Sequence, residues 1–155
     1  MTGVMKLFRQ SLRAAFVAVL ALSFLSGSFL APPAHATTTI ERDLARYHNN
    51  TRASRGIPRL YLNESLSDKA RAHSRAMQSR GSIFHTANLA GVYRSWSWSY
   101  LGENVGVGPS MLDLHKAFMN SPGHRANILK RQYRRFGVGA TKVGSRIWVT
   151  VIFMG

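Results

Sequence analysis

The chain has 155 residues, and its 21 lysines and arginines outnumber six aspartates and glutamates. This length predicts one domain of ordinary size, and the excess of positive charge predicts attraction to anionic partners. The sequence contains no cysteine, which excludes a disulfide framework, a thiol nucleophile and a zinc–thiolate site.

Residues 1–36 have the pattern of a secretory signal peptide. The basic start MTGVMKLFRQSLR precedes the apolar run AAFVAVLALSFL, and AHA at residues 34–36 forms a small-x-small cleavage site. The apolar run is shorter than the roughly 20 residues of a membrane-spanning helix, which disfavours an uncleaved anchor. We therefore predict cleavage after Ala36 and a single mature domain over residues 37–155. Its predicted location is extracellular, with the periplasm or the cell envelope as alternatives.

Removal of the leader takes away three basic residues and no acidic ones, so the mature net charge is 18 − 6 = +12. A field of this sign attracts anionic polymers of the cell envelope and acidic lipids. Outside the cell these partners rank above nucleic acid, which we do not expect as a partner. The alternative is that the charge serves only solubility or general surface adhesion.

The first half of the mature chain predicts two helices. The first has Thr39 as its N-cap and ends before Gly56. Its inner face, at helical spacing, comprises Ile40, Leu44, Tyr47 and Thr51. After a loop through IPRLYLNES, Ser65 is predicted to cap the second helix. One face of that helix comprises Leu66, Ala70, His73 and Met77, and the residues predicted to point away are Lys69, Arg71, Arg75 and Arg80.

The second half predicts an extended segment, two helices and a hairpin. Aromatic residues alternate with serine in RSWSWSY, which is typical of an extended segment. Ser110 starts a helix with the inner residues Met111, Leu114 and Phe118, and Ser121 with Pro122 starts a short one. Residues 136–154 alternate and turn at KVGS, and Ile147 to Met154 is apolar on both faces, as in a central strand. The order predicts an α+β layered domain.

Three of the five mature histidines are predicted to have structural or supporting positions. His73 lies on the apolar stripe of its helix, so we predict a hydrogen-bonded core histidine rather than a ligand. His48 and His115 lie on predicted helices, and only Asp113 is an acidic residue close enough in sequence to orient either ring. We predict surface or supporting positions for both.

His85, His124 and Glu103 are the candidates for chemistry. Both histidines lie where regular structure ends, and functional groups are often carried by loops and helix starts. Two imidazoles and one carboxylate are a common ligand set of catalytic zinc. Without metal, the same groups provide a general base and its orienting partner. The structural alternative is that Glu103 only accepts hydrogen bonds from loop amides.

Four segments together resemble one protein family. NNTRASRGIPRLYLNESLSDKARAHSRAMQSRGSIFH, GENVGVG, FMNSPGHRANIL and FGVGATKVGSRIWVTVIF follow the order of motifs in the CAP superfamily, also called SCP or allergen V5 domains. The resemblance covers residues 40–154 and is similar to the bacterial secreted branch, which the missing disulfides also fit. It implies a three-layer α-β-α sandwich with a central antiparallel sheet, an extracellular location and a central cleft.

In animal and plant members of that family, the cleft carries two histidines and two glutamates and can hold a divalent metal, usually zinc. The matching motifs place His85 and Glu103 in two of these positions and His124 in a third. No glutamate follows Phe118, where the second one is expected. The resemblance therefore implies a zinc or other divalent cation site made of His85, His124 and Glu103, with no cofactor strictly required. Supporting residues in the same motifs are Asn104, Ser121 and Arg125.

Our predicted function is a secreted binding module. Its expected ligand is a small hydrophobic, lipid- or sterol-like molecule or an anionic cell-envelope polymer or lipid. One alternative is a hydrolase in which His85 or His124 is the base and Glu103 orients it, and another is a cationic membrane- or wall-adhesive protein. Binding is favoured because Ser121 is the one serine near His124 in sequence, and an N-cap role already explains it.

Two further segments each have a ligand-binding interpretation and a structural one. RSWSWSY provides either an aromatic ligand platform or, by preference, inner-face packing. KRQYRR, at residues 130–135, provides either contacts to phosphate groups or a solvated face.

Overall fold

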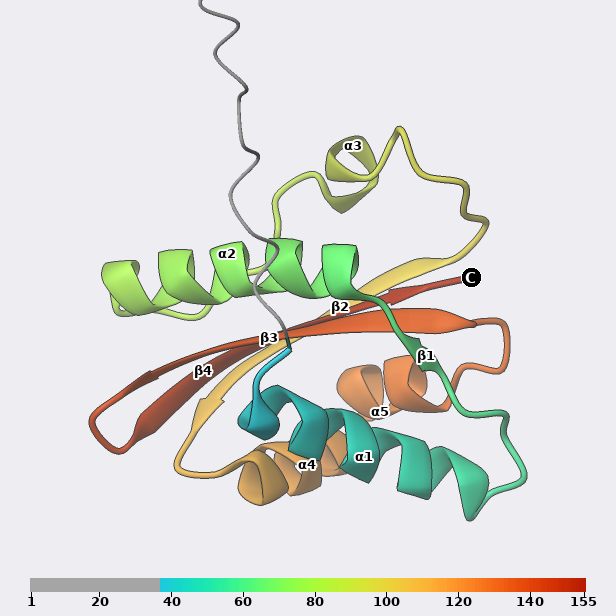
Figure 1. Ribbon diagram of the computed structural model, residues 1–155, viewed down its shortest axis with the longest axis horizontal. Coiled ribbons are helices and arrows are strands. Elements are labelled where there is room, and N and C mark those ends of the chain that lie inside the picture. Colours follow the sequence, from blue (N-terminus) through green and yellow to red (C-terminus); the bar gives the residue numbers. More distant parts are fainter. Residues whose placement is uncertain (1–36) are drawn as a thin grey trace, which may run out of the picture. The chain divides into compact units, whose positions relative to one another are not determined.

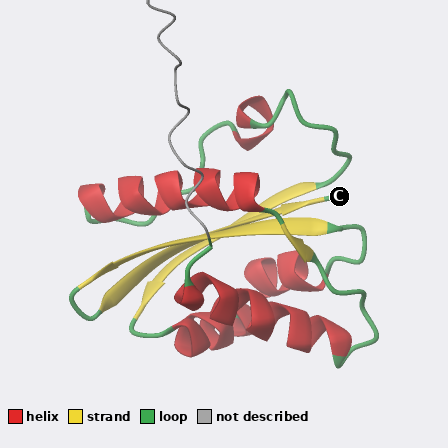
Figure 2. Cartoon of the chain, viewed as in Figure 1, coloured by secondary structure: helices red, strands yellow, loops and turns green. Residues whose placement is uncertain are grey.

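Helices cover both faces of a four-stranded sheet (Figures 1 and 2). This computed structural model describes residues 37–155, and the predicted signal peptide lies outside the described residues. One face carries α2 (Glu64–Arg80), and the other carries α1 (Thr39–Ala53), α4 (Met111–Asn120) and α5 (Pro122–Leu129). The short α3 (Leu89–Val92) interrupts the long connection that follows α2. The three layers confirm the predicted fold class.

The sheet has the strand order β1-β3-β4-β2. Its strands are β1 (Tyr61–Leu62), β2 (Leu101–Gly108), β3 (Arg135–Val143) and β4 (Arg146–Met154). β4 pairs antiparallel with both β3 and β2, and every β4 residue after Arg146 is buried, which confirms the predicted central strand. β1 pairs parallel with β3, so the sheet is mixed, and the predicted loop IPRLYLNES contains a short strand.

The helix starts differ from the predicted ones by one or two residues. Thr38, not Thr39, caps α1, because its hydroxyl accepts the amide of Glu41 at 3.4 Å while its own amide donates to the Glu41 carboxylate at 2.7 Å. Asn63, not Ser65, caps α2. The predicted cap of α4 at Ser110 is confirmed.

The aromatic segment before β2 is irregular rather than extended, because β2 begins only at Leu101. Trp96 and Trp98 are half-buried and pack beside a cluster that includes the buried Tyr93, so packing of these two rings is confirmed. Tyr100 is 41% exposed. No helix within residues 37–155 has the length and apolar character needed to cross a membrane.

The predicted division between buried and exposed residues is wrong at several polar positions. Leu44, Leu66 and Met77 are buried as expected. The predicted surface or supporting residues His48 and His115 are also buried, as is Arg71, which was expected to point away from the core. The other unexpected buried residues are Glu41 and Arg52. Most of these side chains are held by hydrogen bonds to groups far away in sequence, and such bonds are what make the burial of a polar group tolerable.

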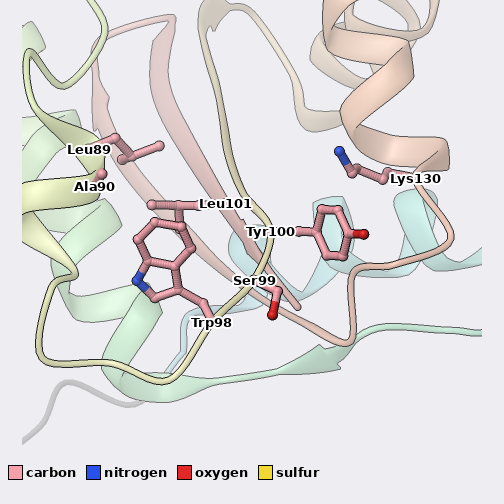
Figure 3. Close-up of a pocket in the computed structure, with 7 residues that line it drawn as sticks. All are labelled: Leu89, Ala90, Trp98, Ser99, Tyr100, Leu101 and Lys130. Carbon is pink, nitrogen blue, oxygen red and sulfur yellow. The ribbon is translucent and has the colours of Figure 1, made fainter.

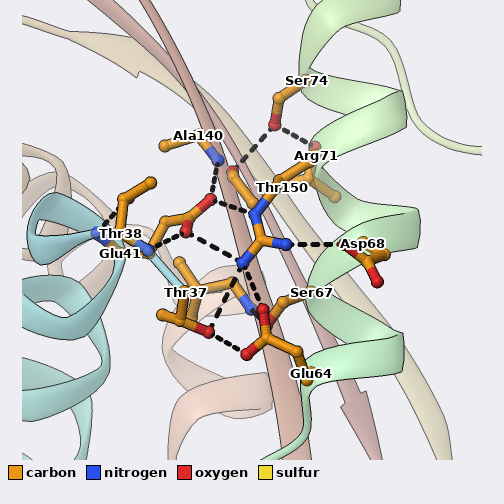
Figure 4. Close-up of polar contacts among 12 residues, drawn as sticks. Thr37, Thr38, Glu41, Glu64, Ser67, Asp68, Arg71, Ser74, Ala140 and Thr150 are labelled. Carbon is orange, nitrogen blue, oxygen red and sulfur yellow. Dashed lines mark hydrogen bonds and ion pairs between the residues drawn. The ribbon is translucent and has the colours of Figure 1, made fainter. Parts of the chain in front are cut away.

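Arg71 is the centre of a polar cluster that joins α1, α2 and β3 (Figure 4). Its Nε and Nη2 donate to Oε1 and Oε2 of Glu41 at 2.9 and 3.1 Å. Further donors reach Glu64 at 2.8 Å and Asp68 at 2.7 Å. Glu41 Oε1 also accepts the amide of Ala140 on β3 at 3.0 Å. The bidentate pair between Arg71 and Glu41 therefore fixes both helices to the sheet.

His48 and His115 form a second buried polar pair, between α1 and α4. Their Nδ1 atoms lie 2.9 Å apart, so one ring donates to the other, and His115 Nε2 lies 2.9 Å from the Thr51 hydroxyl. The His48 ring stacks on Phe153 with the planes 3° apart. Burial, followed by the charge of His115, lowers the pKa of His48 to about 3. The pair is therefore neutral at pH 7.

Two glycines of β3 allow α2 to lie directly on the sheet. A Cβ at Gly139 would lie 2.0 Å from the backbone nitrogen of Arg71 and 2.1 Å from the carbonyl carbon of Ala70. We expect Gly139→Ala to lower the free energy of unfolding by about 1–3 kcal/mol, because helix and strand backbones must separate. Urea denaturation measures the effect.

The matched control for this prediction is Gly123→Ala in α5. A Cβ at Gly123 would meet no atom within 4 Å. Alanine also has the higher helix propensity, so this change should leave stability equal or improved. Equal effects of the two substitutions would contradict the close approach of α2 to β3.

Candidate functional site

Glu103 lies near the start of β2 and is held by the segment that follows α2. Its side chain is 4% exposed. Its Oε2 accepts hydrogen bonds from the Thr86 amide at 2.9 Å and from His85 Nδ1 at 2.9 Å. Its Oε1 accepts the Thr86 hydroxyl at 2.6 Å. The carboxylate thus fixes the loop that carries His85, and the expected contact between Glu103 and His85 is present.

His85 remains accessible although one ring nitrogen is engaged. Its side chain is 60% exposed. Because a carboxylate only accepts, His85 Nδ1 donates, and the neutral ring then has Nε2 as its acceptor. His73 extends the network: its Nε2 donates to the Phe84 carbonyl at 2.8 Å, and its Nδ1 lies 3.4 Å from the Thr86 hydroxyl. The predicted hydrogen bonding of His73 is confirmed, although the ring is only half-buried.

His124 adjoins the same region through its backbone and its electrostatics. Its carbonyl accepts the side-chain amide of the fully buried Asn104 at 3.0 Å, and its ring packs edge-on against Phe118. Burial lowers the pKa of His124, and the charge of His85 is the second cause. The two imidazoles therefore lie within electrostatic range of each other, without a hydrogen bond between them.

Asn127 and Thr86 are site residues that sequence reasoning missed. The Asn127 side-chain amide donates to the Glu103 carbonyl at 3.2 Å and to Asn104 Oδ1 at 2.9 Å, which fastens α5 to β2. Asn127 lies within the motif SPGHRANIL, which contains the candidate His124. Thr86 directly follows the candidate His85. Nothing in the local sequence indicated their partners, which lie on a strand distant in sequence.

Two predicted supporting residues, Ser121 and Arg125, make fewer side-chain hydrogen bonds around the site than Asn104 does. Ser121 occupies the N-cap position of α5, but its side chain makes no capping hydrogen bond. Arg125 is exposed, and its backbone amide donates to the Ser121 carbonyl at 2.8 Å as part of the helix. Neither side chain is tied to Glu103 or His85 by a described hydrogen bond or ion pair.

The residues present do not fit a zinc centre. Within residues 37–155, no group of three or more His, Cys, Asp or Glu side chains is placed to hold a metal ion. Both oxygens of Glu103 already accept hydrogen bonds, from His85 and from two groups of Thr86. The predicted set of His85, His124 and Glu103 therefore lacks the geometry of a metal centre, and we assign no metal to it.

Two hollows lie near this network. One, of about 360 Å³, is bordered by His73 and Thr86 and has apolar walls that include Val92 and Ile152. The other, of about 380 Å³, is drawn in Figure 3. Its walls combine apolar residues from α3 and from the start of β2 with Tyr100 and with Lys130, the residue after α5.

Comparison with known proteins agrees with this architecture. A family model described as "CAP: Cysteine-rich secretory protein family" matches residues 45–153. The uncharacterized protein YkwD of Bacillus subtilis (strain 168) is 34% identical over 127 residues, which cover 77% of this chain and 49% of that protein. The chain thus spans about half the length of this relative.

Solved structures share the fold at lower identity. An outer surface protein from Borrelia burgdorferi superposes with a TM-score of 0.66 at 17% identity, covering 73% of this chain and 90% of that one. An extracellular protein containing an SCP domain from Bacillus anthracis superposes with a TM-score of 0.64 at 23% identity, covering 74% and 39%. With the family model matching most of the described residues, the chain belongs to the CAP, or cysteine-rich secretory protein, family.

Proposed function

We propose that this CAP domain is an extracellular binding module for an anionic amphiphile of the cell envelope, that is, a molecule with an apolar body and an acidic head. The observation that carries the proposal is the hollow of Figure 3, where apolar walls face a lysine. Its volume of about 380 Å³ is within the range of small-molecule sites. The extracellular location is supported by the predicted signal peptide and by the likeness to an extracellular SCP protein.

The apolar part of the hollow comes from α3 and from the residues around the start of β2. Leu89 and Ala90 of α3 lie on one side, and Trp98 and Leu101 lie beside them (Figure 3). The indole nitrogen of Trp98 donates to the Tyr93 carbonyl at 2.9 Å, so the ring is fixed and offers its apolar surface. Rigid apolar walls of this kind suit an acyl chain or a ring system.

Lys130 provides the cation of the hollow. Its Nζ lies 4.8 Å from the ring centroid of Tyr100 and 5.6 Å from that of Tyr133, which positions the charge against aromatic surface. No carboxylate pairs with Lys130 among the described ion pairs. The two sequence segments RSWSWSY and KRQYRR thus meet at one site, and an acidic head group would give Lys130 its counter-charge.

The charge of the whole domain favours the same class of ligand. Of the 18 lysines and arginines after residue 36, two, Arg46 and Arg71, form ion pairs with carboxylates within the described part of the chain. The other 18 − 2 = 16 form no described ion pair, and residues 37–155 keep a net charge of 18 − 6 = +12. Such a field raises the local concentration of anions, and its effect weakens as salt rises.

Binding of oleate and of oleyl alcohol, which share one chain and differ in charge, tests the proposal by calorimetry. We expect Lys130→Gln to weaken oleate binding about tenfold, or about 1.4 kcal/mol, and to change the affinity for oleyl alcohol by no more than about twofold.

Ala90→Phe should weaken the binding of both ligands because the larger side chain fills the hollow. Lys142→Gln, an exposed lysine on the β3–β4 hairpin, is the charge-matched control and should change neither. Unaltered binding in Ala90→Phe, or no binding to the unchanged protein, would refute this site.

A hydrolase remains the second candidate because of one observation. His85 Nδ1 donates to Glu103 at 2.9 Å, which leaves Nε2 as an acceptor on an exposed ring, as in a base with its orienting carboxylate. The nearby Thr86 hydroxyl is less suited as a nucleophile because it is committed to Glu103 at 2.6 Å. Turnover of a nitrophenyl ester that disappears in His85→Gln would favour the hydrolase over the binding module.

A further inference from the structure

Thr37, the residue that follows the predicted cleavage site, lies inside the Arg71 cluster (Figure 4). Thr37 is 7% exposed. Its hydroxyl donates a short hydrogen bond to Oε2 of Glu64 and accepts one from Arg71 Nη2 at 3.4 Å. The first residue of the predicted mature domain is therefore packed against charged groups rather than extended into solvent.

The backbone nitrogen of Thr37 is close to two carboxylates. By covalent geometry it lies within about 4 Å of its own hydroxyl oxygen, the atom that is bonded to Glu64. The next backbone nitrogen along the chain, that of Thr38, donates to Glu41 Oε2 at 2.7 Å. A charged group at the Thr37 nitrogen would thus stand about 4–6 Å from the carboxylates of both Glu64 and Glu41, which is the range of strong charge interaction.

The cluster has more negative than positive charge among the described side chains. Its carboxylates are those of Glu41, Glu64 and Asp68. Arg71 pairs with all three, and the charge of Arg42 acts on Glu64. The balance is 2 − 3 = −1. Desolvation acts to raise the pKa of Glu64, but hydrogen bonds from Thr37 and Arg71 and the charges of Arg71 and Arg42 hold it below its ordinary value. The lowered pKa keeps the Glu64 carboxylate ionised at neutral pH, so the side of the cluster that faces Thr37 attracts a cation.

We propose that cleavage after Ala36 releases an α-ammonium group at Thr37 that joins this cluster, balances its charge and stabilises the folded domain. Before cleavage, the same nitrogen is a neutral amide with one proton. After cleavage, it carries a positive charge, and the carboxylates of Glu64 and Glu41 lie within the range of strong charge interaction. Processing would then act on folding as well as on location, because the mature domain gains a charge attraction that the precursor lacks. The proposal rests on the predicted signal peptide and is independent of the ligand.

The test uses the full-length chain, exported and processed by a bacterial host. N-terminal sequencing of the purified protein should begin at Thr37. Trace acylation over a range of pH, read by mass spectrometry of the N-terminal peptide, then gives the pKa of the α-amine. We expect it to be raised at least about one unit above the ordinary 7.7–8.0, so that the amine reacts about fivefold more slowly at pH 8 than an ordinary one. In Glu64→Gln it should return toward the ordinary range.

The same interaction predicts a signature in stability. A group with a raised pKa stabilises the fold fully below its unfolded pKa, near 7.7–8.0, and the contribution disappears as pH rises through the folded value. The melting temperature should therefore fall between about pH 8 and pH 10, and it should fall less in Glu64→Gln. Glu64 is 40% exposed at its side chain, so this variant is expected to fold.

Two controls separate the cluster from other causes. Asp43→Asn removes a carboxylate from the same helix as Glu41, but one that pairs with Arg46 on the surface, so the α-amine should keep its raised pKa. Insertion of Ser-Gly-Ser between Ala36 and Thr37 retains the cleavage site and moves the amine away, so its pKa should become ordinary. If the protein begins at Thr37 but its α-amine has an ordinary pKa, the proposed interaction with the carboxylates is wrong. If the purified protein begins at another residue, the proposed cleavage after Ala36 is wrong.

Discussion

Replacement of Arg71 by methionine is expected to lower the free energy of unfolding by about 3–5 kcal/mol, the magnitude typical of breaking one partner out of a buried ion pair. Methionine keeps an unbranched apolar stem but leaves the carboxylate of Glu41, which is fully buried, without its bidentate donor. Glu64 and Asp68 add little to this loss, because their side chains are 40% and 36% exposed and water can replace the arginine. Denaturation in urea at pH 7 measures the change.

Arg75→Met is the matched control, since Arg75 is an exposed arginine on the same helix. It should change stability by no more than about 0.5 kcal/mol. A double variant, Arg71→Met with Glu41→Leu, should recover part of the loss, because it removes the unpaired buried charge together with its partner. Similar effects of Arg71→Met and Arg75→Met would show that the cluster does not hold the two helices on the sheet.

Acidification is expected to destabilise the protein through His48. The pKa of His48 is lowered to about 3 by burial and by the charge of His115, whereas an unfolded histidine titrates near 6.5. Below about pH 6.5 the unfolded chain therefore binds a proton that the folded chain excludes, so stability is retained above that pH and lost as pH falls. At pH 4.5 the loss from this residue amounts to about 2–3 kcal/mol. Burial also lowers the pKa of His115, with Arg55 as the second cause, which adds to the effect.

His48→Phe tests this prediction through the slope of stability against pH. Phenylalanine can stack on Phe153 as the imidazole does, and it does not titrate. The variant loses the hydrogen bond to His115, so its stability at pH 7 should fall, while the slope between pH 7 and pH 4.5 should flatten. Phe118→Leu, which alters the edge contact to the same ring, should lower stability equally at both pH values. An unchanged slope in His48→Phe would assign the acid sensitivity to other groups.

The sequence by itself determined the long helices, the C-terminal hairpin and the layered α+β class. The stripe of Met111, Leu114 and Phe118 is buried as its spacing predicts, and the apolar run of β4 occupies the centre of the sheet. These patterns are informative because a helix or strand repeats its buried face at a fixed period, so each residue need be judged only by its own polarity. Family resemblance added the pairing of His85 with Glu103, which stand 18 residues apart.

The tertiary structure alone decided which polar residues are buried and what they meet. No hydropathy pattern predicts the burial of Glu41, His48 and Arg71. Each is buried because it hydrogen-bonds a residue 30 or more positions away: Glu41 bonds Arg71, and His48 bonds His115. In the same way, the hollow lined by Trp98 and Lys130 and the hydrogen bond between Thr37 and Glu64 join residues that are distant in sequence. Burial of a charged or polar group is favourable only when a distant element supplies the opposite charge or hydrogen-bond partner, and a local pattern contains no information about that element.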